Sequence, residues 1–286
     1  MMQNEHYTES YYEGLQSGVT RSAEVIVPLI LQLLPLRSVV DVGCGQGGWL
    51  AVFRKLGVED VFGVDGDYID RDALQIPQDR FHPADLSKPV TLTRTFDLAV
   101  SLEVAEHLPA ECAGVFVGSL TRLASVILFS AAIPFQGGNH HLNEEWPDKW
   151  AELFKRCGYW AVDPIRRQVW ENEAVEWWYA QNTMLFVRAD LLEDIPALKA
   201  EFERTDPHQL CLVHPRQYLY LQSQYRETLL REAKLRAHPA AGLKAASLIL
   251  WDCIKNAVRF RLYRMFRRQA APSGRPNPCE PGARHG

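Results

Sequence analysis

Short apolar runs alternate with amphipathic segments through most of this chain. The apolar runs lie at 38–42, 61–65, 80–82, 96–102 and 125–133. Helical spacing of apolar residues follows two of them, at Trp49, Leu50, Val52, Phe53 and Leu56 and at Phe116, Val117, Leu120 and Leu123. Strands that alternate with helices predict an α/β fold with a parallel sheet. The run at 125–133 is almost wholly apolar, which predicts a central strand buried on both faces.

The flanking segments predict further elements. Apolar residues from Ala23 to Leu34 predict a helix, with Thr20 or Ser22 as its N-cap and Pro35 as its stop. Two more strands are predicted at 160–165 and 182–187. The predicted divisions are an N-terminal helical lid or packing segment at 1–37, a ligand-binding domain at 38–190, a helical extension at 191–268 and a disordered Pro- and Gly-rich tail at 269–286.

Composition narrows the class of protein. The chain has 286 residues, 47% of them hydrophobic, and a net charge of −4, which argues against nucleic acid as a partner. No apolar run approaches the roughly 20 residues that span a bilayer. The six cysteines contain no C-x-x-C pair, so no zinc cluster of that kind is predicted. A polar N-terminus without a secretory signal predicts a cytoplasmic location.

A glycine-rich turn follows the first apolar run and carries two overlapping patterns. Gly43, Gly45 and Gly48 match the G-x-G-x-x-G of dinucleotide-binding folds. Asp41, Gly43, Gly45 and Gly47 instead match D-x-G-x-G-x-G. Asp65 ends the second run, 22 residues after Gly43, where a carboxylate can accept both ribose hydroxyls of an adenosine. This feature is common to NAD and to S-adenosylmethionine (SAM) binding.

The end of the fourth apolar run separates the two ligands. Residues 103–109 read E-x-x-E-H-x-P, and together with the D-x-G-x-G-x-G turn this stretch resembles class I SAM-dependent methyltransferases over about residues 20–190. The resemblance implies a Rossmann-like α/β fold with a seven-stranded, mostly parallel sheet and a C-terminal antiparallel hairpin. It also implies SAM as the cofactor, with contacts from Asp41, Gly43, Cys44, Gly45, Gly47, Asp65, Asp85, Leu86 and Glu103.

Methyl transfer to a hydroxyl needs a base opposite the cofactor, and the loop after the fifth run is rich in candidates. His141 and His140 are the first candidates for a general base, with His107 next. In the alternative, Glu103, Glu106, His107 and His141 resemble the E-x-x-E-H…H metal site of small-RNA 2′-O-methyltransferases. A divalent ion, Mg²⁺ or similar, would then polarise the acceptor hydroxyl.

The resemblance also suggests the acceptor, a hydroxyl of a saccharide, glycoconjugate or other small metabolite. The candidate substrate residues are Asn143, Trp146, Trp177, Trp178 and Tyr12. The alternatives are an RNA 2′-O-methyltransferase, an NAD-dependent oxidoreductase and a non-catalytic SAM-binding scaffold.

One further segment points to a partner. Residues 243–268 form a basic amphipathic stretch, which predicts peripheral contact with the inner face of a membrane, docking on its own domain, or a homodimer.

Overall fold

The computed structural model describes residues 9–237, 247 and 250–251. A first compact unit extends to Gln217, and a second unit begins at Tyr218. The predictions for 243–268 and 269–286 therefore fall outside the described residues, apart from three isolated positions. In the part of the chain that is described, no helix is both long enough and apolar enough to cross a membrane.

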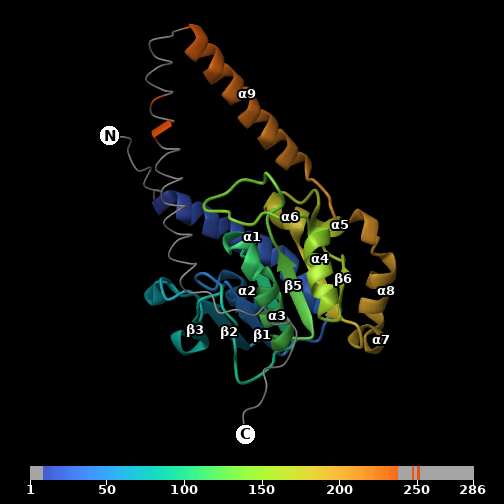
Figure 1. Ribbon diagram of the computed structural model, residues 1–286. Coiled ribbons are helices and arrows are strands. Elements are labelled where there is room, and N and C mark those ends of the chain that lie inside the picture. Colours follow the sequence, from blue (N-terminus) through green and yellow to red (C-terminus); the bar gives the residue numbers. More distant parts are fainter. Residues whose placement is uncertain (1–8, 238–246, 248–249, 252–286) are drawn as a thin grey trace, which may run out of the picture. The chain divides into compact units, whose positions relative to one another are not determined.

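The first unit is built on one sheet (Figure 1). Its strands are β1 Ser38–Val42, β2 Asp60–Asp65, β3 Phe81–Pro83, β4 Leu98–Leu102, β5 Val126–Ser130, β6 Tyr159–Val162 and β7 Met184–Arg188. The seven strands lie in the order β3-β2-β1-β4-β5-β7-β6. β7 is antiparallel to both β5 and β6, and the other neighbours are parallel. The predicted Rossmann-like sheet with a C-terminal antiparallel hairpin is confirmed.

Helices cover both faces of this sheet. The α-helices of the first unit are α1 Glu9–Leu33, α2 Gly48–Lys55, α3 Ala113–Leu123, α4 Pro147–Arg156, α5 Arg166–Val169, α6 Trp177–Asn182, α7 Leu191–Asp194 and α8 Pro196–Arg204, and α9 Pro215–Ala237 lies mostly in the second unit. Alternate residues of β1 enter two separate cores, because successive side chains of a strand point to opposite faces. Val39 packs in the core that holds Phe53 of α2, and Val40 packs in the core that holds Phe116 of α3. A fully buried Phe such as Phe116 contributes about 1.5–3 kcal/mol to folding.

α1 begins well before the predicted start, and the proposed cap is wrong. Ser22 lies inside the helix, where its hydroxyl donates to the carbonyl of Gly18 at 2.7 Å and accepts the backbone N–H of Glu176 at 2.9 Å. Thr20 is also an interior position. A Cβ at Gly18 would lie 2.5 Å from the Glu176 carboxylate. The polar residues around Gly18 and Ser22, which resemble a helix start in the sequence, thus form the surface of α1 that contacts Glu176, the residue before α6.

β5 is shorter than the apolar run that predicted it. The run continues to Ile133, but the strand ends at Ser130. Residues beyond Ser130 stay buried while their backbone bonds pass to the following loop: the Ile133 N–H donates to Gln136 Oε1 at 3.2 Å, and the Ala132 carbonyl accepts from Glu145 N at 3.3 Å. Burial alone therefore does not mark the end of this strand.

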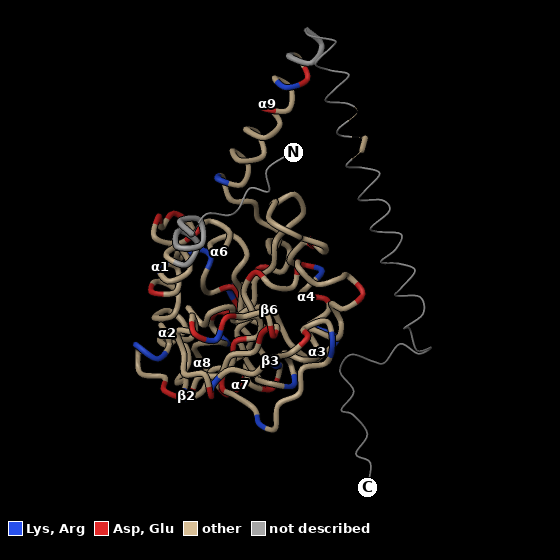
Figure 2. Tube along the Cα trace, turned by 90° about the vertical axis from the view of Figure 1, so that its left-hand side faces the viewer, with Lys and Arg blue, Asp and Glu red and all other residues tan. Residues whose placement is uncertain are grey.

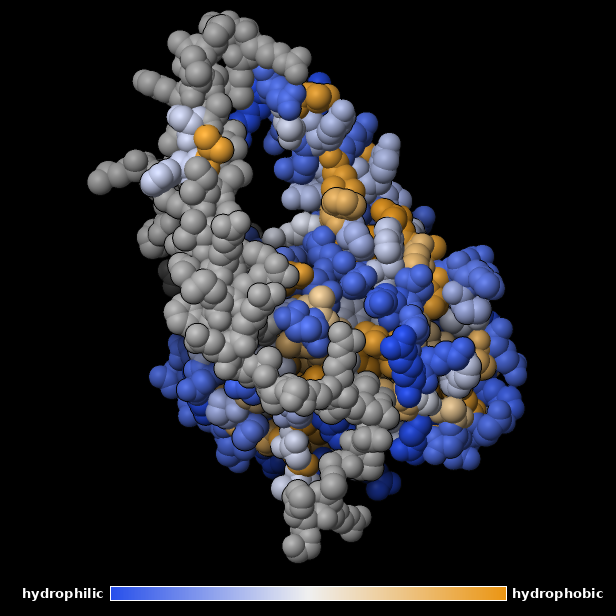
Figure 3. All heavy atoms as spheres, in the orientation of Figure 1, coloured by the Kyte–Doolittle hydropathy of each residue, from blue (hydrophilic) through white to orange (hydrophobic). Residues whose placement is uncertain are grey.

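The remaining helices follow β7. α7 contacts β7 and α8 contacts β6. Basic and acidic positions are interspersed along the described trace (Figure 2). In the second unit, Leu219, Leu229 and Leu230 of α9 are exposed. Apolar and polar surface is mixed along the described part of this helix (Figure 3).

Candidate functional site

The turn after β1 is shaped by three glycines with positive φ. Gly43, Gly45 and Gly47 have φ of 90°, 53° and 83°, values that residues other than glycine rarely adopt. Gly43 has a second reason to be glycine, because a Cβ there would lie 2.3 Å from Val104 in the turn after β4. The loops after β1 and β4 therefore meet at a position that only glycine allows.

Asp41 precedes this turn, Cys44 is part of it, and both residues are buried. Burial, and then the charge of Asp65, raises the pKa of Asp41 well above its usual value. Burial also raises the pKa of the Cys44 thiol, with the charges of Asp41 and Asp65 adding to it. A Cβ at Gly63 would lie 2.8 Å from the Cys44 sulfur, so that glycine makes room for the thiol. A nearby cation would stabilise the charged form of this buried carboxyl.

Asp65 connects the first two loops. Its Oδ2 accepts the Gly45 N–H at 2.7 Å, and its Oδ1 accepts the Gly66 N–H at 2.6 Å and the Tyr68 hydroxyl at 2.8 Å. The residue is buried. The predicted ribose-binding carboxylate thus lies directly beside the glycine turn.

Asp85 and Leu86 follow β3, as the sequence predicted. Asp85 is half-exposed, and its carboxylate accepts from the Ser87 hydroxyl at 2.6 Å and pairs with Lys88 at 2.9 Å. The hydrogen bond from Ser87 and that from Lys88 lower the pKa of Asp85. Leu86 is buried. A contact between Asp85 and an adenine amino group stays a prediction.

Glu103 directly follows β4 and has a strained conformation, with φ of 55°. Its Oε2 accepts from Gln136 Nε2 at 2.7 Å and its Oε1 from Asn182 Nδ2 at 3.1 Å. Burial raises the pKa of Glu103, against the opposing effect of hydrogen bonds from Asn182, Ser130 and Gln136. Both oxygens are thus held by amides from distant segments of the chain.

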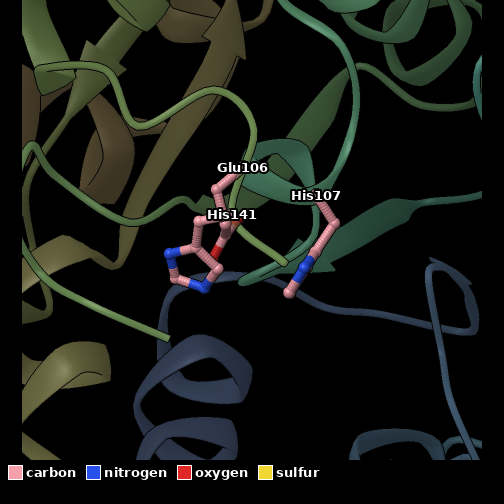
Figure 4. A group of neighbouring side chains, drawn as sticks. All are labelled: Glu106, His107 and His141. Carbon is pink, nitrogen blue, oxygen red and sulfur yellow. The ribbon is translucent and has the colours of Figure 1, made fainter. Parts of the chain in front are cut away.

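Three of the four predicted metal ligands come together. Potential ligand atoms of Glu106, His107 and His141 lie within 4.8 Å of one another, and their side chains converge from the turn after β4 and the loop after β5 (Figure 4). The two imidazoles meet edge to face, with centroids 4.9 Å apart. Glu103 is outside this group.

Glu106 is the unusual member of the group. It is fully buried, and within the described structure neither carboxyl oxygen has a hydrogen-bond partner. Burial, and then the charge of Glu103, raises the pKa of Glu106 well above its usual value. Burial, and then His141, lowers the pKa of His107. A buried acid without partners beside two imidazoles is an arrangement that a cation would satisfy.

The loop after β5 holds His141 in one orientation. His141 Nδ1 lies 2.9 Å from Glu144 Oε1, and Glu144 also accepts the backbone N–H groups of Phe135 and Gly137 at 2.7 and 3.2 Å. A Cβ at Gly138 would lie 2.2 Å from His141 Nε2. Glu144 fixes the ring from one side while the glycine leaves room on the other.

The neighbouring candidates differ in placement. His140 is exposed, has φ of 59° and does not belong to the three-residue group. Asn143 is buried; its backbone N–H donates to the Glu106 carbonyl at 3.0 Å, while its side-chain Nδ2 has no partner in the described residues. Trp146 is 38% exposed at the start of α4. Asn143 thus contacts Glu106 through its backbone.

The aromatic segment at α6 divides into two. Trp177 lines a cavity of about 220 Å³ together with Trp170, Glu171, Asn172, Glu173 and His214. Trp178 instead packs on the core beside Tyr179, whose ring meets Trp49 of α2 at 5.2 Å. The side chain of Tyr12 is outside the described part of the structure.

Sequence reasoning missed Gln136, Asn182 and Glu144. Gln136 and Asn182 hold Glu103, and Glu144 holds His141. Gln136 and Asn182 lie far from Glu103 in the sequence, so no local pattern identifies them. Glu144 stands three residues after His141, in the same polar run, and that spacing was the one available signal.

Comparison with known proteins identifies one family and several similar solved structures. The family described as "Methyltransferase domain" matches residues 15–183, whereas no curated protein matches the sequence. DesVI of Streptomyces venezuelae superposes with a TM-score of 0.49 at 17% identity, over 63% of this chain and 96% of that one. The sugar N-methyltransferase KedS8 from Streptoalloteichus gives 0.49 at 16%, over 63% and 91%. Magnesium protoporphyrin IX methyltransferase from Synechocystis gives 0.46 at 19%, over 60% and 83%. At these identities the solved structures carry no argument about the acceptor.

Proposed function

The chain belongs to the methyltransferase-domain family, and from this premise we propose that it transfers the SAM methyl group to a hydroxyl of a saccharide, glycoconjugate or small metabolite. The protein is a SAM-dependent methyltransferase. Membership of this family argues against the alternative of an NAD-dependent oxidoreductase. The observation that carries the proposal is the pairing of His141 with Glu144 at the carboxyl end of β5.

This pair supports a general-base role. With Glu144 accepting the proton on Nδ1, the lone pair of His141 stands on Nε2. The acceptor oxygen attacks the methyl carbon, the carbon–sulfur bond breaks, and the hydroxyl proton passes to Nε2. The sulfonium becomes the neutral thioether of S-adenosylhomocysteine (SAH), and the imidazolium is stabilised by Glu144. A base of this kind contributes about 10²–10⁴ in rate.

The cofactor side supports SAM on grounds of charge. Burial, and then the charge of Asp65, raises the pKa of Asp41. The ammonium group of SAM would favour the carboxylate form of Asp41, and a ribose diol would use Asp65. Both assignments are part of the proposal.

A divalent metal fits a smaller ligand set than the sequence predicted. Glu106, His107 and His141 would hold it, because the Glu106 oxygens have no partner among the described residues and both imidazoles lie alongside. Glu103 lies outside this ligand set, and its oxygens accept from Gln136 and Asn182. A bound ion would polarise the acceptor hydroxyl. With or without it, Glu144 orients the His141 ring.

The cavity beside α6 supports a hydroxylated acceptor. Trp177 and Trp170 provide apolar ring faces, and the exposed side chains of Glu171, Asn172 and Glu173 provide hydrogen-bonding groups beside them. Aromatic faces combined with convergent polar groups are suited to a polyol.

The test uses methyl-labelled SAM and a bacterial lysate divided into saccharide, lipid, RNA, protein and small-molecule fractions. We expect label in the saccharide, lipid-linked or small-molecule fraction. His141→Ala should abolish that label and leave SAM binding unchanged. His140→Asn is the matched control, because Asn tolerates the positive φ and the neighbouring imidazole is kept.

Other results would redirect the proposal. Label in RNA would favour the metal-assisted alternative on an RNA acceptor, and loss of transfer with a chelator would support the metal in either case. Unchanged transfer by His141→Ala would place the base elsewhere. SAM binding without label in any fraction would favour the scaffold alternative.

A further inference from the structure

Tyr68 touches the predicted ribose-binding carboxylate although nothing in the sequence motifs points to it. Its hydroxyl donates to Asp65 Oδ1 at 2.8 Å, while 82% of the residue is exposed to solvent. The contact raises the pKa of the Tyr68 phenol, after the larger effect of burial around the hydroxyl. The tyrosine is thus anchored at its polar end while its ring is largely open to water.

The acceptor capacity of Asp65 makes this contact consequential. A carboxylate offers about four lone-pair sites. In the structure Oδ1 accepts from Gly66 N at 2.6 Å and from Tyr68, and Oδ2 accepts from Gly45 N at 2.7 Å. One site is left, whereas the two hydroxyls of a ribose need two. The two backbone donors are fixed by the chain, so Tyr68 is the donor that can leave.

Gly66 provides the room that the contact needs. A Cβ at this position would lie 2.1 Å from the Tyr68 ring. The backbone at Gly66 is not in the left-handed region, so its conformation does not require glycine. Glycine at this position therefore matters for the space it leaves above the chain, and the Tyr68 ring occupies that space.

We propose that Tyr68 is a latch on the cofactor-binding carboxylate. Its hydroxyl occupies one of the two acceptor sites that the ribose of SAM needs, and it releases Asp65 when the cofactor binds. The inference rests on the proposed function, because it takes Asp65 as the ribose acceptor. SAM and SAH carry the same ribose, so the latch weakens the binding of both by the same factor and favours release of the product.

The test is a calorimetric titration of the full chain with SAM and with SAH. Tyr68→Phe should tighten binding of both ligands by the same factor, about two- to tenfold, the net value of one hydrogen bond. Gly66→Ala should act in the same direction, because its Cβ displaces the ring while the hydroxyl is kept. Tyr218→Phe, which removes the same hydroxyl from another exposed tyrosine, should change neither affinity.

Further variants separate the latch from its premise. In an Asp65→Ala chain the latch has nothing to hold, so adding Tyr68→Phe should have no effect. If Asp65→Ala alone binds SAM as tightly as wild type, the ribose assignment and the latch both fail. If Asp65→Ala weakens binding but Tyr68→Phe leaves it unchanged or weaker, only the latch is overturned, and weaker binding would mean that the Tyr68 hydroxyl contributes to it. A wild-type chain that binds no SAM would overturn the proposed function as well.

Discussion

On the cofactor side of the sheet, formed by residues 41–48 and 65–68, glycines with positive φ turn the chain and backbone N–H groups hold the key carboxylate. On the acceptor side, formed by residues 103–107 and 134–146, positive φ also occurs at Glu103, Phe135 and His140, where it is costly. Side chains rather than backbone groups fix the key residues on the acceptor side, Gln136 on Glu103 and Glu144 on His141.

The difference shows two ways to build a site. The cofactor side is shaped by local conformation, so a few consecutive residues determine it. The acceptor side stores strain that the surrounding hydrogen bonds must hold in place. We expect substitution of its glycines to disrupt the cofactor side. We expect removal of one side-chain contact to disrupt the acceptor side.

The largest effect is expected at Gly43, where the two sides touch. Gly43→Ala meets Val104 at 2.3 Å as well as adopting positive φ. The strain costs about 1–2 kcal/mol, and the overlap adds about 1–3 kcal/mol. Gly57→Ala is the matched control, with φ of +99° and nothing within 4 Å of its Cβ. Thermal unfolding should show a clearly larger loss for Gly43→Ala, and equal losses would mean that the sides do not press on each other.

The acceptor side is tested next through Glu144. Glu144→Gln weakens the hold on His141 Nδ1, and loss of such an orienting partner typically lowers activity about 10–100-fold. SAM affinity should stay unchanged, because the cofactor side is held independently. Turnover with labelled SAM and calorimetric binding measure the two sides separately. A parallel fall in SAM affinity would contradict this independence.

SAM binding is expected to depend on pH through Asp41 on the cofactor side. Burial and Asp65 raise the pKa of Asp41 in the free protein, and a bound ammonium group lowers it again. Binding then releases a proton, so SAM affinity rises with pH by at most about tenfold per pH unit. The affinity levels off above the pKa that Asp41 has in the free protein. Titrations between about pH 5 and 7 keep the SAM amino group protonated. Asp41→Asn should remove the slope, and a wild-type affinity that is flat or falls with pH would refute the assignment.

The smallest effect concerns strain at His140. His140→Gly relieves about 1–2 kcal/mol of positive-φ cost, offset by about 0.5–1 kcal/mol for the extra freedom of glycine in the unfolded chain. The net gain in unfolding free energy should stay below about 1.5 kcal/mol, with turnover retained. Chemical denaturation measures the unfolding free energy, and the labelling assay measures turnover. A destabilised variant would mean that the His140 side chain makes a stabilising contact.

The same contrast explains what the sequence could predict. Asp41, Gly43, Gly45 and Asp65 stand at fixed spacings around short apolar runs, and the structure brings them together as expected. Each depends on local conformation, which a sequence records directly. The sheet was predictable for the same reason, because apolar runs and helical spacing repeat along the chain.

The acceptor side was only partly predictable. Glu106, His107 and His141 come together, but Glu103 lies outside this group and is bound by Gln136 and Asn182, neither of which stands in a pattern with Glu103. Trp177 and Trp178 are adjacent in sequence yet face a cavity and the core respectively. Contacts between distant segments decide these outcomes, and one sequence does not record them.

The strand order has a consequence for synthesis on the ribosome. Within the described residues, β6 pairs with β7 alone, and β7 also covers the edge of β5. β6 has no partner, and the second edge of β5 stays uncovered, until residues 184–188 have been made. A nascent chain that stalls before this point presents the apolar edge of β5, an open template for pairing with other chains. Completion of the sheet is therefore set by one late strand, and truncations just before it should aggregate although they retain every motif residue of the site.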